Sequence, residues 1–477
     1  MNVEVRDGDL LGADAALVLV GLHEGEEAPA ALAGAPGAAA AKGGFKSLSP
    51  VFPADGPRVL LVGLGEREKL DAERLRVAAA LAVQEARRLG LATIAWLPPD
   101  SLAAEAAVEG VVTGTILGAY RFDRFHREDP DEPPTEIESL TLLAPAALGG
   151  AASAARIGAE AQNRARDLQN TPANFATPAA LAERAEEIAA AADAVSADVL
   201  AREEIVAMGM GGLAAVSQGS AEGPRLIVLR YAGGGDGPTL GLIGKGVTFD
   251  TGGISLKPGA AMNEMKFDMS GGAAVLEAVA AIAELELVVD LVAIVPATEN
   301  MPSGTAIKPG DVITQYNGMT VEVNNTDAEG RLILADALAY AVELGAERLV
   351  DLATLTGAVL IALGSTYAAV IGNDDELAAE LIEAGAETGE LAWRLPLHDE
   401  YREMMKGTVA DLSNLASKRE AGTITAACFL EEFVDDTPWA HVDIAGTAWN
   451  VGRAYTGKEA SGYGVRLLVE LTRRFAG

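Results

Sequence analysis

Four segments in the later part of the chain consist almost entirely of apolar residues, and they limit the folds that the chain can adopt. They are RLIVLRY (225–231), TLGLIG (239–244), LVVDLVAIVP (287–296) and RLVDLAT (348–354). A strand with one face in water alternates apolar and polar side chains, whereas these segments have almost no polar face. They therefore predict strands of a mostly parallel sheet that is buried on both faces.

Two longer apolar segments lie between these strands and predict the helices that cover the sheet. GGAAVLEAVAAIAELEL (271–287) and GRLILADALAYAVELG (330–345) are apolar around most of their circumference at 3.6 residues per turn. Helices of this kind pack against a sheet. We therefore expect an α/β fold in which a mostly parallel central sheet is flanked by helices.

The first part of the chain shows the same alternation with shorter elements. Strands are predicted at 15–22, 58–65, 91–98 and 139–145. A helix is predicted at 70–90, where apolar residues recur at helical spacing. The acidic and proline-rich segment at 127–136 is typical of a loop.

The length of the chain requires more than one hydrophobic core. A single core rarely serves more than about 250–300 residues, and this chain has 477. We expect two domains of the α/β class: a smaller N-terminal domain at 1–150 and a larger C-terminal domain at 171–477. The segment 151–170 has helical spacing and is predicted to be a linker helix between them.

The charge balance argues against nucleic acid as a partner. The chain has 36 Lys and Arg residues against 69 Asp and Glu residues, so its formal net charge is 36 − 69 = −33. A chain this acidic repels phosphate backbones unless a local basic patch attracts them. No such patch is evident in the sequence.

Neither a membrane protein nor a disulfide framework is predicted. No uninterrupted apolar run reaches the roughly 18–20 residues that span a bilayer. The first residues, MNVEVRDGDL, lack the basic and apolar regions of a secretory signal. Cys428 is the only cysteine, which rules out an intrachain disulfide and a cysteine-built metal site. We expect a cytoplasmic protein.

Histidines do not suggest a metal site either. The chain has four of them, and none lies near the acidic clusters described next. A zinc site built from histidines is therefore not expected. We interpret His398 and His441 as structural residues.

A cluster of acids follows the predicted strand MTVEVNN (319–325). Asp327 and Glu329 lie two residues apart, just before the apolar helix that begins near Gly330. In an extended segment such residues share a face, so both carboxylates would point into one volume. The carboxyl ends of strands are where α/β proteins bind ligands. A plainer interpretation is that the acids complement the start of the helix as N-cap residues.

A second cluster makes a ligand site the better interpretation. Lys245, Asp250, Lys257 and Asp268 lie among glycines within 243–272, after another predicted strand. If the two strand ends are neighbours, four carboxylates converge, and two divalent cations would balance their charge. Carboxylate oxygens suit Mg²⁺ or Mn²⁺, and Zn²⁺ also accepts them. Each lysine could contact the metal site or a substrate oxygen, or could form an ordinary ion pair.

These clusters resemble those of the leucyl aminopeptidases, the cytosol aminopeptidase family of exopeptidases with two metal ions. NTDAEGRL (325–332) matches the family signature, and GKGVTFDTGGISLK (244–257) and HVDIAG (441–446) follow the family pattern in the expected order. The resemblance covers residues from about 160 to 477 strongly. It implies a catalytic C-terminal domain, a macro-like N-terminal domain and a homohexamer.

The resemblance also implies roles for individual residues. Five residues would bind the two metal ions: Lys245, Asp250, Asp268, Asp327 and Glu329. Lys257 would stabilise the developing oxyanion, and Arg331 would hold a bicarbonate that helps to deprotonate the attacking water. Four residues would line the pocket for the first side chain of the substrate: Met265, Thr354, Gly357 and Ala445. The ions would be Mn²⁺ or Zn²⁺, with Mg²⁺ as a third option, and the substrates would be peptides with a free N-terminus and a leucine or another apolar residue first.

Two other functions fit parts of the sequence. A phosphoesterase with two metal ions also uses clustered carboxylates, but it would release phosphate and would not require an amine. A regulator that binds a ligand or DNA through its N-terminal domain would need no catalysis. A DNA-binding regulator would need a basic surface, against which the net charge of −33 argues.

Overall fold

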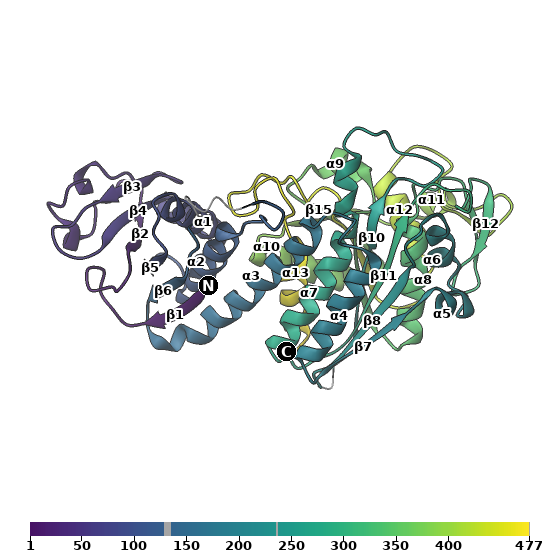
Figure 1. The fold of residues 1–477 in the computed structure, drawn as a ribbon, viewed down its shortest axis with the longest axis horizontal. Coiled ribbons are helices and arrows are strands. Elements are labelled where there is room, and N and C mark those ends of the chain that lie inside the picture. Colours follow the sequence, from purple (N-terminus) through teal and green to yellow (C-terminus); the bar gives the residue numbers. More distant parts are fainter. Residues whose placement is uncertain (128–134, 235–236, 477) are drawn as a thin grey trace. The chain divides into compact units, whose positions relative to one another are not determined.

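We analysed a computed structural model of the protein, which describes residues 1–127, 135–234 and 237–476. The chain divides into two compact units (Figure 1). One comprises Met1–Asn163 and Gly452–Gly457, and the other comprises Arg164–Val451 and Lys458–Gly477. Most of the loop predicted at 127–136 lies outside the described residues.

The N-terminal unit contains a six-stranded sheet. Its strands are β1 (Asn2–Arg6), β2 (Leu17–His23), β3 (Leu48–Val51), β4 (Arg58–Gly65), β5 (Thr93–Leu97) and β6 (Ser139–Leu143). They lie in the order β1-β6-β5-β2-β4-β3. Only β3 runs antiparallel to its neighbour. The predicted strands correspond to β2, β4, β5 and β6, whereas β1 and β3 were not predicted.

Two helices of this unit pack closely against each other. The predicted helix is α1 (Ala72–Arg88), and its partner α2 (Ala104–Ala119) was not predicted. Helix α2 contacts α1 through glycines spaced four residues apart, Gly110, Gly114 and Gly118. A Cβ at Gly114 would lie 2.2 Å from the carbonyl oxygen of Arg76. Glycine permits this close approach, but it weakens the helical signal in the sequence, which explains the missed prediction.

The second unit is built on a nine-stranded sheet. Its strands are β7 (Val195–Leu200), β8 (Arg225–Ala232), β9 (Leu240–Gly244), β10 (Gly246–Asp250), β11 (Asp290–Asn300), β14 (Arg348–Ala353), β15 (Ala368–Gly372), β16 (Ala392–Arg394) and β18 (Trp439–Asp443). Eight of them lie side by side in the order β16-β15-β18-β14-β9-β11-β8-β7. The ninth, β10, pairs with the part of β11 that extends past the end of β9. The central strands β18, β14, β9 and β11 are parallel. This was predicted for β14, β9 and β11, whereas β18 was not predicted.

The prediction was wrong for one strand of this set. Strand β8, predicted from RLIVLRY, runs antiparallel to both of its neighbours, β11 and β7. An uninterrupted apolar segment shows that both faces of a strand are covered, but it does not determine the direction of the strand. The sheet is therefore mostly, not wholly, parallel.

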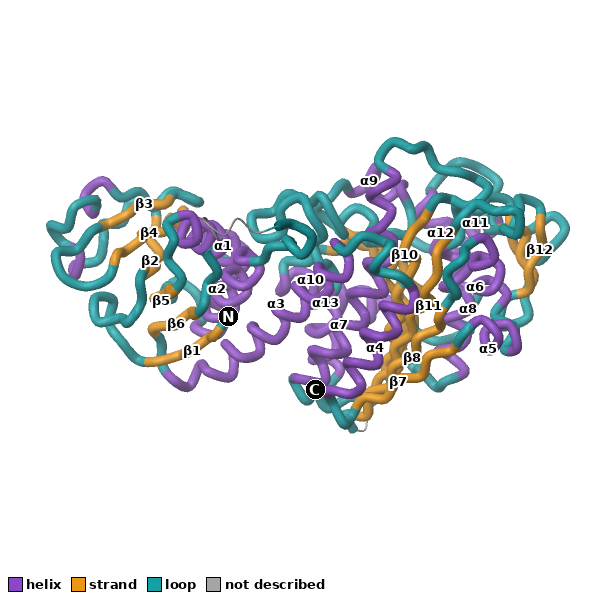
Figure 2. Tube along the Cα trace, in the orientation of Figure 1, coloured by secondary structure: helices purple, strands orange, loops and turns teal. Residues whose placement is uncertain are grey.

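Helices cover both faces of this sheet, as Figure 2 shows. One layer contains α4 (Pro178–Ala191), α7 (Ser270–Glu284), α10 (Asp375–Thr388) and α13 (Val465–Phe475). The other contains α5 (Arg202–Ala207), α6 (Gly211–Val216), α8 (Gly330–Glu343), α11 (Asp399–Glu403) and α12 (Gly422–Glu431). The helices predicted at 271–287 and 330–345 are α7 and α8.

Two further helices and a small sheet lie outside these layers. Helix α3 (Gly149–Asn170) corresponds to the linker helix predicted at 151–170, and the short helix α9 (Gly357–Leu363) follows β14. A small sheet combines β12 (Asp311–Thr314), β13 (Thr320–Val323) and β17 (Leu412–Ser413). No helix among the described residues is long and apolar enough to cross a membrane.

A buried acid fixes the position of α8. Asp336 is fully buried in this apolar helix. Its carboxylate accepts hydrogen bonds from the backbone N–H of Leu213 on α6 and of Tyr316 after β12, both at 2.9 Å. A buried carboxylate is tolerated when backbone donors satisfy it. Asp336 therefore ties α8 to two separate segments.

Candidate metal centre and active site

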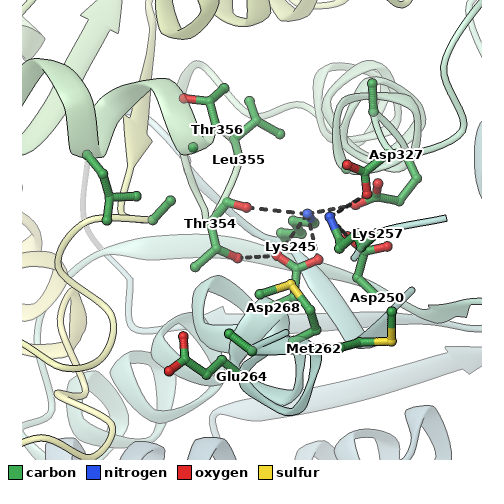
Figure 3. A pocket seen from close by; sticks show the side chains of 18 of the residues that line it. Lys245, Asp250, Lys257, Met262, Glu264, Asp268, Asp327, Thr354, Leu355 and Thr356 are labelled. Carbon is green, nitrogen blue, oxygen red and sulfur yellow. Dashed lines mark hydrogen bonds and ion pairs between the residues drawn. The ribbon is translucent and has the colours of Figure 1, made fainter. Parts of the chain in front are cut away.

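The predicted site lies where the central strands of the larger sheet end. Lys245 follows β9, Asp250 ends β10, and Thr354 follows β14. Because these strands are parallel neighbours, their carboxyl ends bring these side chains to one edge, which is the usual ligand-binding edge of an α/β sheet. Figure 3 shows them converging with Asp268 and Asp327.

Three of the acids are close enough to share a cation. Ligand oxygens of Asp250, Asp327 and Glu329 all lie within 4.8 Å of one another. Asp268 lies on the 3-10 helix η6 (Met262–Met269), immediately before α7. It joins the group through Lys245, which contacts both Asp268 and Glu329.

Each of the two lysines lies between two carboxylates. Lys245 Nζ is 2.8 Å from Asp268 Oδ2 and 2.8 Å from Glu329 Oε1. Lys257 Nζ is 2.8 Å from Asp250 Oδ2 and also forms an ion pair with Asp327. The dashed lines in Figure 3 mark interactions of both lysines. With protein groups alone, both lysines form ion pairs. The sequence had left open whether they form ion pairs or contact the metal site or a substrate oxygen.

The two lysines hold their protons firmly in these surroundings. Burial by itself lowers the pKa of Lys245, but neighbouring carboxylates, foremost Asp268 and Glu329, raise it by more. The pKa of Lys257 is raised as well, because the charges of Asp250 and Glu329 outweigh the effect of burial. Both side chains are therefore ammonium groups when only protein groups surround them.

The acids of the site are harder to ionise together. Burial raises the pKa of Asp268 to about 8 and that of Asp250 to about 6, and the charge of Glu329 adds to both. Burial also raises the pKa of Asp327. The pKa of Glu329 alone is lowered, because the two lysines outweigh its burial. Ionisation of all four acids beside two ammonium groups would leave a surplus of negative charge. Divalent cations would balance this charge, and carboxylate oxygens suit such ions.

Arg331 adds a third cation with an unused donor. It lies in the first turn of α8 and lines the same cavity as the acids, although it is only 9% exposed. Its Nη1 donates to the carbonyl oxygen of Asn414 at 2.9 Å, whereas its Nε has no hydrogen-bond partner among the described residues. Burial lowers the pKa of Arg331 to about 10, which still leaves it charged at neutral pH. The free donor suits an anion.

One detail of the sequence prediction was wrong. The segment that carries Asp327 and Glu329 is not extended: Thr326 and Asp327 lie in a turn, and the backbone of Glu329 is helical, with φ −75° and ψ −35°. The two carboxylates converge because of this turn. The N-cap interpretation also fails for Glu329, because its side chain forms no capping hydrogen bond.

The predicted substrate pocket belongs to the same cavity. This cavity has a volume of about 380 Å³, and all eleven predicted metal, catalytic and pocket residues line it. The predicted pocket residues are Met265, Thr354, Gly357 and Ala445. Thr354 also donates to Asp268 Oδ1 at 2.6 Å, so the pocket and the acidic cluster share a wall.

Other residues at this site were not predicted from the sequence. Asn300, at the end of β11, is buried and donates to Asp250 Oδ1 at 2.8 Å and to the carbonyl oxygen of Thr326 at 3.0 Å. It thereby holds one acid against the turn that carries another. A polar residue at the carboxyl end of a buried strand was the available signal. Glu264 and Trp449 also line the cavity and were not predicted.

Comparison with known proteins identifies the family. Residues 163–469 match the catalytic domain of the cytosol aminopeptidase family, and residues 37–129 match its N-terminal domain. The chain belongs to the cytosol aminopeptidase family. The predicted family, α/β fold and aminopeptidase function are therefore confirmed. The roles of the individual site residues stay predictions.

Individual relatives resemble the enzyme over most of its length. A probable cytosol aminopeptidase of Roseiflexus castenholzii (strain DSM 13941 / HLO8) is 46% identical over 485 residues, covering 99% of either chain. One of Geobacter sp. (strain M21) is 49% identical over 423 residues, covering 87% of this chain and 86% of its own. The solved structure of the bottromycin maturation enzyme BotP in complex with Mn has a TM-score of 0.88 and 36% identity, and the match covers 97% of this chain and 100% of that one.

A buried histidine lies on β18, the strand that leads to one side of the cavity. His441 on β18 is opposite Asp351 on β14, and its Nδ1 lies 2.6 Å from Asp351 Oδ1. Trp439 Nε1 donates to the other oxygen of Asp351 at 2.7 Å. All three side chains are fully buried. This arrangement supports the structural interpretation of His441.

The same strand continues to a second buried acid. Asp443 accepts hydrogen bonds from the Thr356 hydroxyl at 2.5 Å and from the backbone N–H of Leu355 and Ala445 at 3.3 and 3.2 Å. These donors belong to the loops after β14 and β18, which line the cavity. Asp443 therefore holds one wall of the cavity in place.

We expect His441 to make stability depend on pH. Burial lowers the pKa of His441, and the positive charge of Arg331 lowers it further. The charge and hydrogen bond of Asp351, together with the charge of Asp443, outweigh both effects, so the pKa is raised. A histidine whose pKa is higher in the folded state stabilises that state below its unfolded pKa of about 6.5. This stabilisation is lost as the pH rises through the folded pKa.

The substitution His441→Gln should therefore be most damaging at low pH. It should reduce the free energy of unfolding by about 3–5 kcal/mol near pH 6, since it removes one partner of a buried pair. The difference from the wild type should narrow at higher pH, as measured by thermal unfolding between pH 6 and 9. The control His398→Gln alters an exposed histidine and should not show this trend. A constant difference for His441→Gln would mean that His441 is neutral throughout.

Proposed function

We propose that the enzyme is a leucyl aminopeptidase that removes leucine and other apolar residues from peptides with a free N-terminus. The observation that carries the proposal is the single cavity in which four carboxylates, two lysines and Arg331 adjoin a pocket with small and apolar walls. Two divalent ions bound there would polarise the scissile carbonyl and lower the pKa of the attacking water. Family membership supports the same reaction.

The proposed metal ligands are the five residues that meet in the cluster: Lys245, Asp250, Asp268, Asp327 and Glu329. Lys245 would have to give up its proton and bind as a neutral amine, which a nearby divalent cation favours. The proximity of Asp250, Asp327 and Glu329 supports their part in this set, because one oxygen of each could reach the same cation. Oxygen-rich ligands suit Mn²⁺ and Mg²⁺, and Zn²⁺ is also compatible. That a similar enzyme has been solved in complex with Mn supports manganese.

Lys257 and Arg331 are the proposed catalytic residues. Lys257 is less deeply buried than Lys245, with 22% of its side chain exposed, and its ammonium group lies at the acidic cluster. From there it would donate to the oxygen that becomes negative when the carbonyl is attacked. Arg331 would hold a bicarbonate, because a guanidinium group matches two oxygens of a planar anion. That bicarbonate would accept a proton from the attacking water.

The pocket residues explain the proposed side-chain preference. Met265, Thr354, Gly357 and Ala445 leave room for a medium-sized apolar side chain beside the acidic cluster. Discrimination among such side chains should be modest, since one methylene group changes the selectivity by only about 1–3 kcal/mol. The free α-amine of the substrate would be recognised at the cluster itself, which restricts cleavage to the first residue.

The alternative functions have less support. A phosphoesterase would not need a free amine, and the family match favours a peptidase. A DNA-binding regulator would need a basic surface, and the net charge of −33 opposes it.

The assembly and location proposed here rest on resemblance. We propose a cytoplasmic homohexamer, and the names of the relatives support the location. Exposed apolar side chains on the larger unit, including Ile361 at 90% and Val409 at 77%, are available for contacts between subunits. Light scattering should give a mass of 6 × 49.0 = 294 kDa. A monomer or dimer at micromolar concentration would reject the hexamer.

Activity should depend on both metal and a free amine. We expect metal-stripped enzyme to be inactive on leucine p-nitroanilide and to recover when Mn²⁺ or Zn²⁺ is added. N-acetyl-leucine p-nitroanilide should remain uncleaved under every condition, because its amine is blocked. Equal cleavage of the acetylated substrate would refute the recognition of the amine. Inactivity with every metal, in folded protein, would refute the proposed function.

Substitutions should separate the two catalytic residues. Lys257→Gln should lower kcat by about 10²–10³-fold through loss of one oxyanion donor. Arg331→Lys should lower kcat as well and abolish the response of the rate to added bicarbonate, because an ammonium group cannot match two oxygens of a planar anion. The bound metal of each variant is measured so that loss of ions is not mistaken for loss of catalysis.

A matched control is Lys308→Gln, which removes an exposed lysine paired with Asp311 on the surface. It should leave both kcat and the bicarbonate response unchanged. If Arg331→Lys still responds to bicarbonate as the wild type does, the anion acts elsewhere.

A further inference from the structure

A buried amide binds the turn that carries Asp327. Asn414 follows β17 directly and is fully buried. Its Oδ1 accepts hydrogen bonds from the backbone N–H groups of Asn324 at 2.8 Å and Asn325 at 3.2 Å. Its Nδ2 donates to the carbonyl oxygens of Asn325 at 2.7 Å and Ala328 at 3.4 Å. All four hydrogen bonds therefore go to one short segment, the turn at 324–328 between β13 and α8.

These contacts use the whole hydrogen-bonding capacity of the Asn414 side chain. A primary amide has an oxygen with two lone pairs and a nitrogen with two N–H groups. The two carbonyl groups that the amide nitrogen binds belong to Asn325 and Ala328, which come before and after Thr326 and Asp327 in the sequence. Asn414 therefore joins the two ends of the turn, and Asp327 lies between them.

Other groups hold the middle of this turn. The Thr326 hydroxyl donates to the carbonyl oxygen of Gly252 at 2.6 Å and accepts from the backbone N–H of Ser255 at 2.8 Å. Asn300 donates to the carbonyl oxygen of Thr326 at 3.0 Å. These contacts fix Thr326, whereas Asn414 fixes the residues before and after it.

Asn414 is itself fixed by the small sheet. Strands β13 and β17 are parallel, with Glu322 opposite Ser413. The backbone N–H of Asn414 donates to the carbonyl oxygen of Glu322 at 3.0 Å. The carboxylate of Glu322 accepts hydrogen bonds from the backbone N–H groups of residues 408–410, in the loop before β17. The amide is therefore held by a folded element on the side away from the turn.

Asp327 depends on its turn more than the neighbouring ligands depend on theirs. Its side chain is 31% exposed, whereas the side chains of Asp250 and Glu329 are each 3% exposed. Close packing restricts the side chain of a buried residue to one arrangement. Asp327 has less packing of this kind, so the conformation of its backbone determines where its carboxylate lies.

We propose that Asn414 is a positioning residue, which holds Asp327 where it can bind one of the two metal ions. The inference rests on the proposed metal site and adds to it a residue that is neither a ligand nor part of the cavity wall. Without the amide, the N–H and carbonyl groups of the turn lose their partners and must find others. Asp327 then leaves the position that the ion requires. The other ion, beside Lys245 and Asp268, does not depend on this turn.

The backbone of Asn414 has a separate contact that the test leaves in place. Its carbonyl oxygen accepts a hydrogen bond from Arg331 Nη1 at 2.9 Å. This contact does not involve the side chain. A change of the side chain therefore tests the turn without deleting the group that Arg331 binds.

The test measures the binding of Mn²⁺ directly and does not depend on catalysis. Metal-stripped enzyme is titrated with Mn²⁺, and the free ion is followed by electron paramagnetic resonance. The wild type should bind two ions per subunit. In Asn414→Ala the Kd of one ion should rise by about 10–100-fold, the usual effect of removing a group that orients a metal ligand. The Kd of the other ion should stay at the wild-type value.

Two further variants keep the result interpretable. Asn373→Ala removes another amide that joins two backbone groups, since Asn373 accepts from the N–H of Trp439 at 2.7 Å and donates to the carbonyl oxygen of Thr437 at 3.0 Å. These residues do not line the cavity, so both Kd values should stay unchanged. Asn414→Ser keeps one donor and one acceptor and should raise the same Kd by a smaller factor. It also provides the answer if Asn414→Ala fails to fold.

The possible outcomes separate this inference from the function on which it rests. Two unchanged Kd values in folded Asn414→Ala would overturn the inference. Equal weakening of both ions would overturn it as well, because a general loss of structure affects both positions. Wild-type enzyme that binds two ions but does not cleave leucine p-nitroanilide would overturn the proposed function and leave the inference intact. Wild-type enzyme that does not bind two ions would overturn the proposed metal site and the inference together.

Discussion

The crowding of four carboxylates at one edge of a buried sheet is the constraint on which the rest of the larger unit depends. Like charges at this distance repel, and burial strengthens the repulsion. The chain offsets it with Lys245 and Lys257, each held between two acids. These ion pairs need rigid supports, and the parallel strands β9, β10 and β14 provide them. The same edge then presents a surplus of negative charge, which is what a pair of divalent cations requires.

Much of this arrangement follows from local sequence. Uninterrupted apolar segments predict the central strands and the helices α7 and α8, because only a sheet covered on both faces buries such segments. Acids placed directly after apolar strands predict a ligand site, because strand ends are where α/β proteins bind ligands. The glycine-rich helix α2 and the antiparallel strand β8 were missed or misassigned for equally local reasons. Glycine weakens the helical signal, and apolar character carries no information on direction.

The finer organisation of the site depends on which strands are neighbours, and local patterns do not encode this. Asn300 reaches Asp250 because β10 and β11 pair, although the two residues are 50 positions apart. Glu264 meets Trp449 across 185 positions of the chain. Both contacts shape the cavity, and neither could be inferred from periodicity. The turn at Thr326 and Asp327 is a similar case, since an extended segment also satisfied the spacing of the acids.

Helix α8 connects the chemistry of the cavity to parts of the enzyme that never touch a substrate. Its first turn carries Arg331 and follows directly on Glu329, while Asp336, further along the helix, is bound to the backbone of α6 and of the segment after β12. Because α8 moves as a rigid element, a small shift in either segment would also move Arg331 and Glu329 at its beginning. Directed evolution of this enzyme can therefore find substitutions on α6, remote from the cavity, that change its turnover. Libraries restricted to the residues of the pocket would not contain these substitutions.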